Sequence, residues 1–324
     1  MKSVGIIGGS GYTGGELIRL VVHHPALTLD FVYSTTRPDT PIYDTHQDLL
    51  GTTKLDFTDK VNENVDVLFL CLGHGNSSSF LEQYRFSDST IIIDLSNDFR
   101  LQADAEFQGH SFVYGLPEFQ REKIEKAKAI ANPGCFATAI QLALLPLAEK
   151  KQLQSVVHVN AITGSTGAGV GLSPTSHFSW RNNNISWYKP FTHQHLGEIG
   201  ETLYSLNDNN PEILFLPQRG DFTRGIFATA YTPYSGSLED AKALYRDFYK
   251  DDPFTHVSEK EIALKLVLNT NNCFLHLHKH KEQLLITSVI DNLIKGASGQ
   301  AIQNLNLMMG WEETLGLTLK PNIF

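Results

Sequence analysis

The sequence predicts an α/β protein whose first part holds a doubly wound parallel sheet and whose second part is an α+β domain. Up to about residue 150, short apolar runs of strand length alternate with segments of helical spacing. Beyond that point, the strand-like segments are longer, and polar loops rich in glycine, proline and asparagine separate them. The 324 residues suffice for two domains. We expect one at 1–148, onto which the C-terminal segment 297–324 packs back, and the other at 149–296.

The elements of the first part follow the pattern of buried parallel strands joined by helices. Such strands read as continuous apolar runs because helices cover both faces of the sheet. The expected strands lie at 4–8, 27–33, 65–72, 90–94 and 128–132, and the expected helices at 13–23 and 139–148.

The elements of the second part predict an antiparallel or mixed sheet. Ser237 is placed as the N-cap of a helix at 238–249, and a final helix at 297–309 is apolar on one face. The expected strands lie at 155–162, 213–216, 226–234, 273–278 and 284–290.

Composition and charge exclude several classes of protein. The formal charge of −9 argues against nucleic acid or an anionic membrane as a partner. No apolar run has the length of a membrane span, and the chain enters a strand pattern directly after Met1, so we expect no signal peptide. Three widely spaced cysteines make neither a disulfide framework nor a metal pair. These features predict a soluble cytoplasmic protein.

A row of histidines at 276, 278 and 280 has strand spacing, so the three side chains would share one face of a sheet. Such a face can build a metal site. An exposed polar face is the simpler interpretation, because antiparallel sheets often present one face to water. We predict no metal.

A glycine-rich loop follows the first expected strand. Gly9, Gly11 and Gly14 fit the pattern G-x-G-x-x-G, and Gly8 replaces Gly9 in an overlapping variant. Glycines let the backbone approach a pyrophosphate, which the N-terminus of the next helix then binds. We therefore predict a dinucleotide site; the alternative is a tight turn with a purely structural role. Its residues are Gly8, Ser10, Gly11, Tyr12, Thr13 and Gly14.

The end of the second strand indicates which dinucleotide binds. An NAD site usually carries an acidic residue there for the ribose hydroxyls. Here small hydroxyls, including Ser34, are followed by Arg37, and a guanidinium pairs well with a 2′-phosphate. The sequence thus favours NADP (NADPH), unless Arg37 is an ordinary solvated charge.

Cys135 stands just before the apolar helical stretch 139–148. A thiol at the mouth of a helix faces unpaired backbone N–H groups and the positive end of the helix dipole, and both favour the nucleophilic thiolate. The alternative is a small buried apolar residue. His193 and His195 are two residues apart, so on a strand both would face one side and could transfer protons.

Six segments, in order along nearly the whole chain, resemble the N-acyl-gamma-glutamyl-phosphate reductases (N-acetyl-gamma-glutamyl-phosphate reductases) of arginine biosynthesis. The segments are 8–17 (GGSGYTGGEL), 93–101 (IDLSNDFRL), 114–118 (YGLPE), 131–138 (ANPGCFAT), 193–199 (HQHLGEI) and 295–301 (KGASGQA). The resemblance implies the fold of the semialdehyde dehydrogenases: a Rossmann domain with bound NADPH, and an α+β catalytic and dimerisation domain that forms a homodimer or homotetramer.

The resemblance also implies roles for residues. Cys135 would be the nucleophile and His193 the acid or base, with His195 and Glu198 orienting or binding the substrate. Ser165, Thr166 and Asn132 would also contact substrate, while Ser96 and Asn292 would belong to the cofactor site. The reaction would be an NADPH-dependent reductive dephosphorylation through a Cys135 thioester.

Departures from the family pattern cluster where substrate should bind. The loop at 164–170 has Thr166 and Val170 in place of a serine and a basic residue, and 219–225 is longer than the usual arginine–glycine turn. The segment 176–189 adds Arg181 and Lys189, which favour an acyl group with its own carboxylate, such as succinyl, over acetyl. The alternative functions are an aspartate-semialdehyde dehydrogenase and a non-catalytic nucleotide-binding protein.

Overall fold

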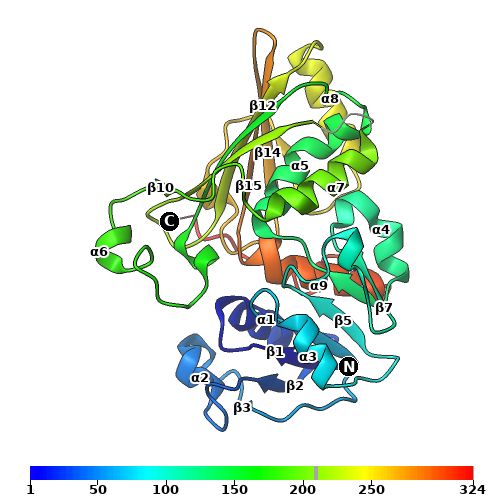
Figure 1. Cartoon of the computed structure of the whole chain (residues 1–324), viewed down its shortest axis with the longest axis vertical. Coiled ribbons are helices and arrows are strands. Elements are labelled where there is room, and N and C mark those ends of the chain that lie inside the picture. The colour runs from blue at the N-terminus through cyan, green and yellow to red at the C-terminus, as the bar shows by residue number, and fades with distance from the viewer. Residues whose placement is uncertain (208–210, 324) are drawn as a thin grey trace. The chain divides into compact units, whose positions relative to one another are not determined.

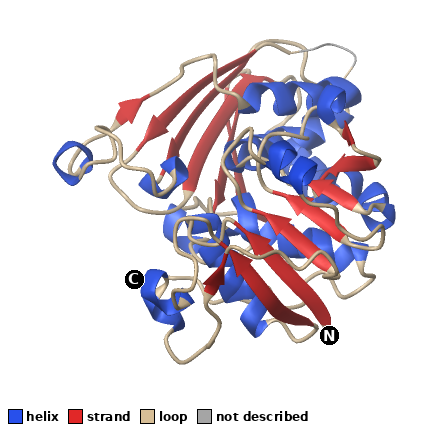
Figure 2. Ribbon diagram, turned by 60° about the horizontal axis from the view of Figure 1, so that its bottom comes forward, coloured by secondary structure: helices blue, strands red, loops and turns tan. Residues whose placement is uncertain are grey.

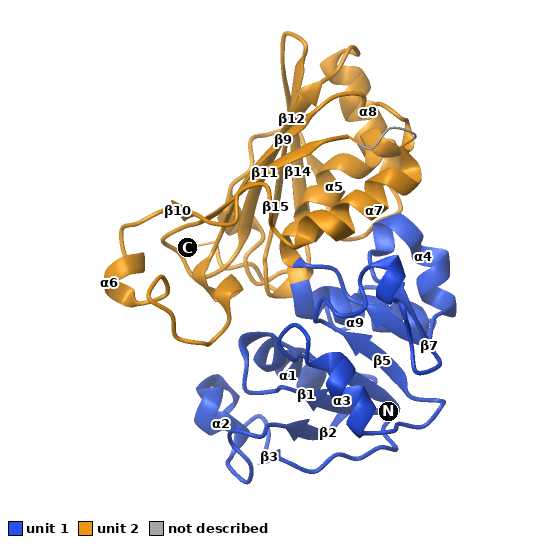
Figure 3. Cartoon of the chain, in the orientation of Figure 1, with its two compact units in different colours: residues 1–134, 297–318 blue, residues 135–296, 319–324 orange. Residues whose placement is uncertain are grey.

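The computed structural model describes residues 1–207 and 211–323. The chain forms two compact units: unit 1 contains Met1–Gly134 and Ala297–Thr318, and unit 2 contains Cys135–Gly296 and Leu319–Phe324 (Figure 3). The first boundary therefore lies at Gly134 and not at residue 148, and the returning segment ends at Thr318.

The boundary lies earlier than expected because of where helix α5 (Cys135–Glu149) packs. It contacts α7 (His195–Leu206) and the strands β12 (Ile226–Pro233) and β15 (Gln283–Ile290), all in unit 2 (Figure 1). Every residue of α5 from Phe136 to Ala148 is buried, so the helix is the core of the second unit.

Unit 1 holds an eight-stranded sheet in the order β3-β2-β1-β4-β5-β8-β7-β6. All neighbouring strands are parallel except β6 and β7. The order with β1 inside and β2 and β4 at its sides confirms the Rossmann-type doubly wound sheet. The strands are β1 (Lys2–Ile7), β2 (Leu27–Tyr33), β3 (Phe57–Thr58), β4 (Val67–Leu70), β5 (Ile91–Asp94), β6 (Glu106–Phe107), β7 (His110–Tyr114) and β8 (Ala129–Ala131).

The central strands are buried along their length; β4, for example, has no exposed residue, as a strand covered on both faces requires. The returning helix α9 contacts α1 and α4 and is buried on its polar side as well. The helices of this unit are α1 (Tyr12–His23), α2 (Ile42–Thr45), α3 (Ser77–Gln83), α4 (Pro117–Lys126) and α9 (Gly299–Met308).

Unit 2 holds a seven-stranded sheet in the order β10-β11-β9-β12-β15-β14-β13. Figure 2 draws the strands of the protein as red arrows. The pairs β9–β11 and β13–β14 are parallel and the other pairs antiparallel, which confirms the mixed sheet. Every second residue of β9 is buried, as in a sheet packed on one face. The strands not yet given are β9 (Val157–Thr163), β10 (Ser186–Trp187), β11 (Ile213–Arg219), β13 (Thr255–Ser258) and β14 (Cys273–His280).

The helices of unit 2 are α5, α6 (Phe178–Arg181), α7 and α8 (Leu238–Phe248), and α5 and α8 contact the sheet. The prediction for α8 is confirmed in detail: Ser237 caps the helix, and Asp240 completes the capping box. Among the described residues, no helix is both long enough and apolar enough to cross a membrane.

Candidate active site

The glycine loop of unit 1 is shaped by close backbone approaches. Gly8 has φ of 81°, and a Cβ on Gly14 would lie 2.6 Å from the Gly8 carbonyl oxygen. A Cβ on Gly9 would lie 2.0 Å from a methyl carbon of Val32. Position 11 is different, since a Cβ there would meet only the Gly8 oxygen, at 3.6 Å. The helix that follows has no side-chain cap at Gly11, so its first N–H groups suit an anionic ligand.

The hydroxyl groups expected at the cofactor site meet at the end of β2. Ser34 donates a hydrogen bond to Ser10 Oγ of the glycine loop at 3.3 Å. Arg37 is exposed and has no ion pair with any residue that the structure describes. A guanidinium in this state is available to an anionic group of a ligand.

His46 belongs to this site, although nothing in the sequence pointed to it. Its Nε2 is 2.8 Å from the carbonyl oxygen of Gly9, and a Cβ on Gly15 would clash with its ring. Burial lowers the pKa of His46. The neutral ring thus holds the glycine loop from the side, a contact that only the fold reveals.

Ser96 lies at the carboxyl end of β5, but its hydroxyl has a local role. It donates to Asp94 Oδ2 at 2.6 Å, and Ser77 donates to the other carboxylate oxygen at 2.6 Å. Burial raises the pKa of Asp94 to about 6, against the opposing effect of these hydrogen bonds. Contact between Ser96 and a cofactor stays a prediction.

Cys135 is the first residue of α5, the position that favours a thiolate. Gly296 lies against it: a Cβ on Gly296 would be 2.8 Å from the Cβ of Cys135. This close approach is in the π-helix η5 (Ile294–Ser298), and a π-helical turn is often found at functional sites. The glycine of the KGASGQA motif is therefore needed for the position of the thiol.

The two histidines lie beside the start of α5. The His193 and His195 rings are 4.5 Å apart, and the Phe136 ring is 5.5 Å from His193. The Tyr188 ring is also near His193, with the ring centres 5.8 Å apart. Phe136 follows Cys135 directly, so the histidines and the thiol share one region of unit 2.

The two histidines do not lie on a strand, the case in which their spacing would place both on one side. His193 precedes α7, and His195 is its first residue, because the apolar positions Ile199 and Leu203 give the segment helical spacing. His193 Nδ1 accepts a hydrogen bond from the His195 backbone N–H at 3.2 Å. The neutral ring therefore carries its proton on Nε2.

Glu198 is buried one turn into α7. Its Oε1 lies 3.9 Å from His195 Nε2, the geometry of an orienting carboxylate. Its backbone oxygen accepts a hydrogen bond from Gln141 of α5 at 3.1 Å, which ties the histidine helix to the cysteine helix.

The loop after β9 forms the short helix η3 (Ser165–Ala168). Thr166 Oγ1 donates to the Thr223 carbonyl at 2.6 Å and accepts from Asn292 Nδ2 at 3.1 Å. Asn292 Oδ1 accepts from the Gly225 N–H at 2.6 Å. Thr166 and Asn292 thus brace neighbouring loops, while Ser165 is half-buried and shows no side-chain hydrogen bond to the described chain. Their contacts with ligands remain predictions.

Asn132 is in unit 1, three residues before the thiol, and is buried. Its Nδ2 donates to the Ala297 carbonyl and its Oδ1 accepts from Asn304 of α9, both at 3.1 Å. Arg100 donates to its backbone oxygen at 2.9 Å. These bonds anchor the end of β8 to the returning segment, whereas binding of substrate by Asn132 stays a prediction.

The structure does not favour Arg181 as a ligand for an acyl carboxylate. Its guanidinium is buried and donates to the backbone carbonyls of Thr175, Asn184 and Arg219 and to Ser186 Oγ. Lys189 is exposed and donates to Gln194 Oε1 at 2.9 Å. Both cations therefore support the loop that contains them.

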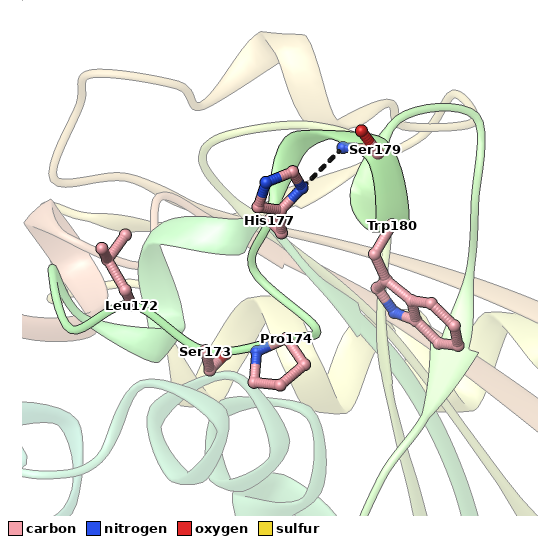
Figure 4. Close-up of a pocket in the computed structure, with 6 residues that line it drawn as sticks. All are labelled: Leu172, Ser173, Pro174, His177, Ser179 and Trp180. Carbon is pink, nitrogen blue, oxygen red and sulfur yellow. Dashed lines mark hydrogen bonds between the residues drawn. The ribbon is translucent and has the colours of Figure 1, made fainter.

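The loop before α6 and α6 itself line an open hollow of about 720 Å³, whose residues are Leu172, Ser173, Pro174, His177, Ser179 and Trp180 (Figure 4). His177 accepts a hydrogen bond from the Ser179 N–H at 3.2 Å. None of the candidate catalytic residues lines this hollow. Within the described chain, no group of three histidine, cysteine, aspartate or glutamate residues could hold a metal ion.

Comparison with known families covers both units. Residues 3–127 match the family described as "Semialdehyde dehydrogenase, NAD binding domain", and residues 135–292 match "Semialdehyde dehydrogenase, dimerisation domain". The second match begins at Cys135, the boundary that the structure shows.

Solved structures share the fold at low sequence identity. Aspartate semialdehyde dehydrogenase II of Vibrio cholerae has a TM-score of 0.73 and 14% identity, over 96% of this chain and 98% of the other. The Candida albicans aspartate semialdehyde dehydrogenase, solved with NADP, has a TM-score of 0.69 and 14% identity, over 95% and 98%.

The sequence relatives are much more similar. The N-acetyl-gamma-glutamyl-phosphate reductase of Flavobacterium johnsoniae is 61% identical over 100% of both chains. This chain is an oxidoreductase and belongs to the N-acetyl-gamma-glutamyl-phosphate reductase family.

Proposed function

We propose that the protein converts an N-acyl-gamma-glutamyl phosphate to the N-acylglutamate 5-semialdehyde, with Cys135 as the nucleophile and NADPH as the reductant. The observation that carries this is the position of Cys135 at the start of α5, backed by Gly296 and beside the His193–His195 pair. Family membership names the reaction, and this arrangement supplies the groups that it needs.

The Cys135 thiolate attacks the gamma-acyl carbon. A carbon–sulfur bond forms, the carbon–oxygen bond to phosphate breaks, and phosphate leaves. The N–H groups at the start of α5 stabilise both the thiolate and the oxyanion on the acyl carbon. Reduction of the resulting thioester requires a hydride, which a bound nicotinamide supplies. The carbon–sulfur bond then breaks, so that the aldehyde leaves and the Cys135 thiolate is regenerated.

We assign the acid–base role to His193. In the neutral ring Nδ1 accepts from the His195 backbone and Nε2 carries the proton, so Nε2 can donate a hydrogen bond to the oxygen on the acyl carbon. The ring takes up a further proton at Nδ1, by giving up the bond from His195. Glu198 holds the neighbouring imidazole of His195, which stabilises the positive charge that forms in this pair.

The residues of the glycine loop fit a pyrophosphate. The close approaches at Gly8, Gly9 and Gly14 leave no room for side chains, and the uncapped start of α1 offers N–H donors. We propose NADP as the cofactor because the exposed Arg37 follows Ser34 at the end of β2.

The proposal is tested by NADPH oxidation with purified protein. N-acetyl- and N-succinyl-gamma-glutamyl phosphate and beta-aspartyl phosphate are supplied in turn, and phosphate release is followed in parallel. We expect turnover with an acylglutamyl phosphate. Turnover with beta-aspartyl phosphate alone would show an aspartate-semialdehyde dehydrogenase, and NADPH binding without any turnover would show a non-catalytic protein.

We also propose that the chain forms a homo-oligomer through unit 2. Large apolar side chains between β9 and α7 are exposed, and this region falls within the match to a dimerisation domain. They are Val170, Leu172, Phe178, Trp180, Ile185, Trp187 and Phe191. Sedimentation of the wild type and of Trp187→Asp tests this: a monomeric wild type contradicts the oligomer, and an unchanged variant excludes Trp187 from the interface.

We place the enzyme in arginine biosynthesis in the cytoplasm. The thiols at 71, 135 and 273 are all within the described chain and form no disulfide, which suits a reducing compartment. Deletion of the gene should make growth depend on arginine, and prototrophic growth of the deletion strain would refute the placement.

A further inference from the structure

We propose that Arg219, together with Thr163, binds a carboxylate of the substrate. The inference rests on the proposed function and adds a subsite to it. The substrate offers two candidates for this carboxylate: the alpha-carboxylate of the glutamyl group, or a carboxylate on the acyl group. Neither residue was among the site residues expected from the sequence. The cations that were expected to do this, Arg181 and Lys189, donate to neutral groups of the chain, including the Arg219 carbonyl and Gln194 Oε1.

Arg219 and Thr163 are neighbours at the ends of two parallel strands. They are paired in register on β11 and β9, so their side chains emerge on the same face. Phe215 lies on that face four residues earlier, and its ring is 5.2 Å from that of Phe136. Phe136 follows Cys135, so the pair occupies the face of the sheet that carries the proposed nucleophile.

Both residues have a buried polar atom that finds no hydrogen-bond partner among the described residues. These atoms are Arg219 Nε and Thr163 Oγ1, and the Thr163 residue is only 1% exposed. Buried polar groups are nearly always paired, so two such groups side by side indicate a missing acceptor. One N–H and one O–H that emerge from the same sheet face match the two oxygens of a carboxylate.

The charge near this pair is positive. No described carboxylate forms an ion pair with Arg219. The neighbouring cation, Arg181, donates its hydrogen bonds to neutral backbone oxygens and a serine hydroxyl. Asp221 acts electrostatically on Arg181 and accepts a hydrogen bond from the Asn183 N–H. The Arg219 guanidinium acts electrostatically on Arg181 as well, so two positive charges lie near each other at the end of β11.

Tyr188 connects this pair to the histidines. The Arg219 guanidinium carbon lies 4.7 Å from the centre of the Tyr188 ring, and the His193 ring contacts Tyr188 at 5.8 Å. Burial raises the pKa of Tyr188 to about 12, and the Cys135 thiolate adds to that effect. The phenol therefore stays neutral, and it lies near enough to Cys135 for the charge of the thiolate to act on it.

A carboxylate fits this pair better than the phosphoryl group does. The phosphate leaves from the carbon that Cys135 attacks, whereas Arg219 is connected to the histidines through Tyr188, whose ring contacts both Arg219 and His193. In a glutamyl group the alpha-carboxyl carbon is four bonds from the gamma-acyl carbon, about 5 Å when the chain is extended.

The test measures the reaction in the oxidative direction, where aldehyde and phosphate are separate substrates with separate KM values. Arg219→Gln should raise the KM for aldehyde about 10- to 100-fold, because a charge-assisted hydrogen bond is lost. The KM for phosphate and for NADP should change less than about twofold. Thr163→Val should raise the aldehyde KM about three- to tenfold, and Arg219→Lys should recover part of the loss.

Two aldehydes separate the two sources of carboxylate. If Arg219 binds the alpha-carboxylate, N-acetyl- and N-succinylglutamate 5-semialdehyde lose affinity equally. If it binds an acyl carboxylate, the loss is confined to the succinyl compound. Lys189→Gln is the matched control, since it removes a nearby exposed charge and should leave every KM within about twofold.

Other outcomes would overturn the inference. A rise in the phosphate KM alone would assign Arg219 to the phosphoryl group, and an unchanged aldehyde KM for both compounds would leave Arg219 without a carboxylate. Wild-type protein that oxidises neither aldehyde would refute the proposed function itself, which separates that failure from the failure of the subsite. If Arg219→Gln fails to give the wild-type circular dichroism spectrum, Arg219→Lys and Thr163→Val still decide the question.

Discussion

The glycine loop of unit 1 and the thiol region of unit 2 are built in opposite ways. The loop is made of backbone from one short stretch, in which Gly8, Gly9 and Gly14 are excluded from bearing side chains by close contacts. The thiol region is made mainly of side chains from segments far apart in the chain: the start of α5, the stretch before α7 and β11. The backbone of Gly296 lies against Cys135.

This difference explains why the glycine loop can be recognised in the sequence, whereas most of the thiol region cannot. A backbone-built site needs glycines at fixed spacing, so its pattern is local. A site built from side chains depends on which strands pair and which helices pack, so its members need not be near one another in sequence. Cys135 is recognised from its local helix, whereas Tyr188 and Arg219 are recognised only from contacts.

The largest expected effect is on turnover when the thiol of unit 2 is replaced, with the binding of cofactor by unit 1 left unchanged. Cys135→Ser should lower kcat at least ~1000-fold, because the hydroxyl is a poor nucleophile and its ester is a poor hydride acceptor. NADPH affinity, measured by fluorescence titration, should stay near the wild-type value. Substantial residual turnover would remove Cys135 from the mechanism, and a parallel loss of NADPH binding would contradict the division of roles.

The pH dependence of stability should come in part from unit 1, through Asp94. The pKa of this carboxyl is raised to about 6 in the folded protein from 3.8, so the folded state binds the proton more tightly. Its contribution is therefore fully present below pH 3.8 and is lost as pH rises through 6, by about 3 kcal/mol in all.

Asp94→Asn should remove that part of the pH dependence. Urea unfolding of both proteins at several pH values between about 4 and 8 measures it. The free energy of unfolding of the wild type should fall relative to the variant as pH rises. Parallel profiles would show that Asp94 ionises normally in the folded protein.

A pair of glycine variants tests the backbone-built site. Gly14→Ala should destabilise the protein by about 1–3 kcal/mol, because the new Cβ meets backbone atoms that cannot move aside. Gly11→Ala is the matched control: its Cβ has room and φ at that position is −81°, so stability should change by less than about 1 kcal/mol. Equal destabilisation in thermal unfolding would contradict the contact argument.

The smallest expected effect concerns the choice of cofactor. Arg37→Ala should weaken NADPH binding about tenfold and NADH binding little, because only NADPH carries the 2′-phosphate. Calorimetric titration with each nucleotide measures the difference. Equal losses for the two nucleotides would refute the preference for NADP.

Much of the fold could be predicted from the sequence because the signals are local. The apolar run of β4 and the Ser237–Asp240 capping box of α8 depend on residues next to one another. The boundary at Gly134 could not be predicted. Helix α5 is buried on all sides, so its sequence does not show which of the two units it packs into. The sequence left the conformation of the His193–His195 segment open, because a spacing of two suits a strand while the residues after it have helical spacing.

The sequence by itself determined the reaction class, the glycine loop and the nucleophile candidate, because each depends on residue types at short spacing or on motifs in order. Only the tertiary structure decided what surrounds them. It showed that the Arg181 guanidinium donates to backbone carbonyls, including that of Arg219. It also showed that His46 contacts the glycine loop and that Arg219 and Thr163 are neighbours on two paired strands. The physical reason is that partners of a polar group are set by strand register and packing, which join residues far apart in the chain.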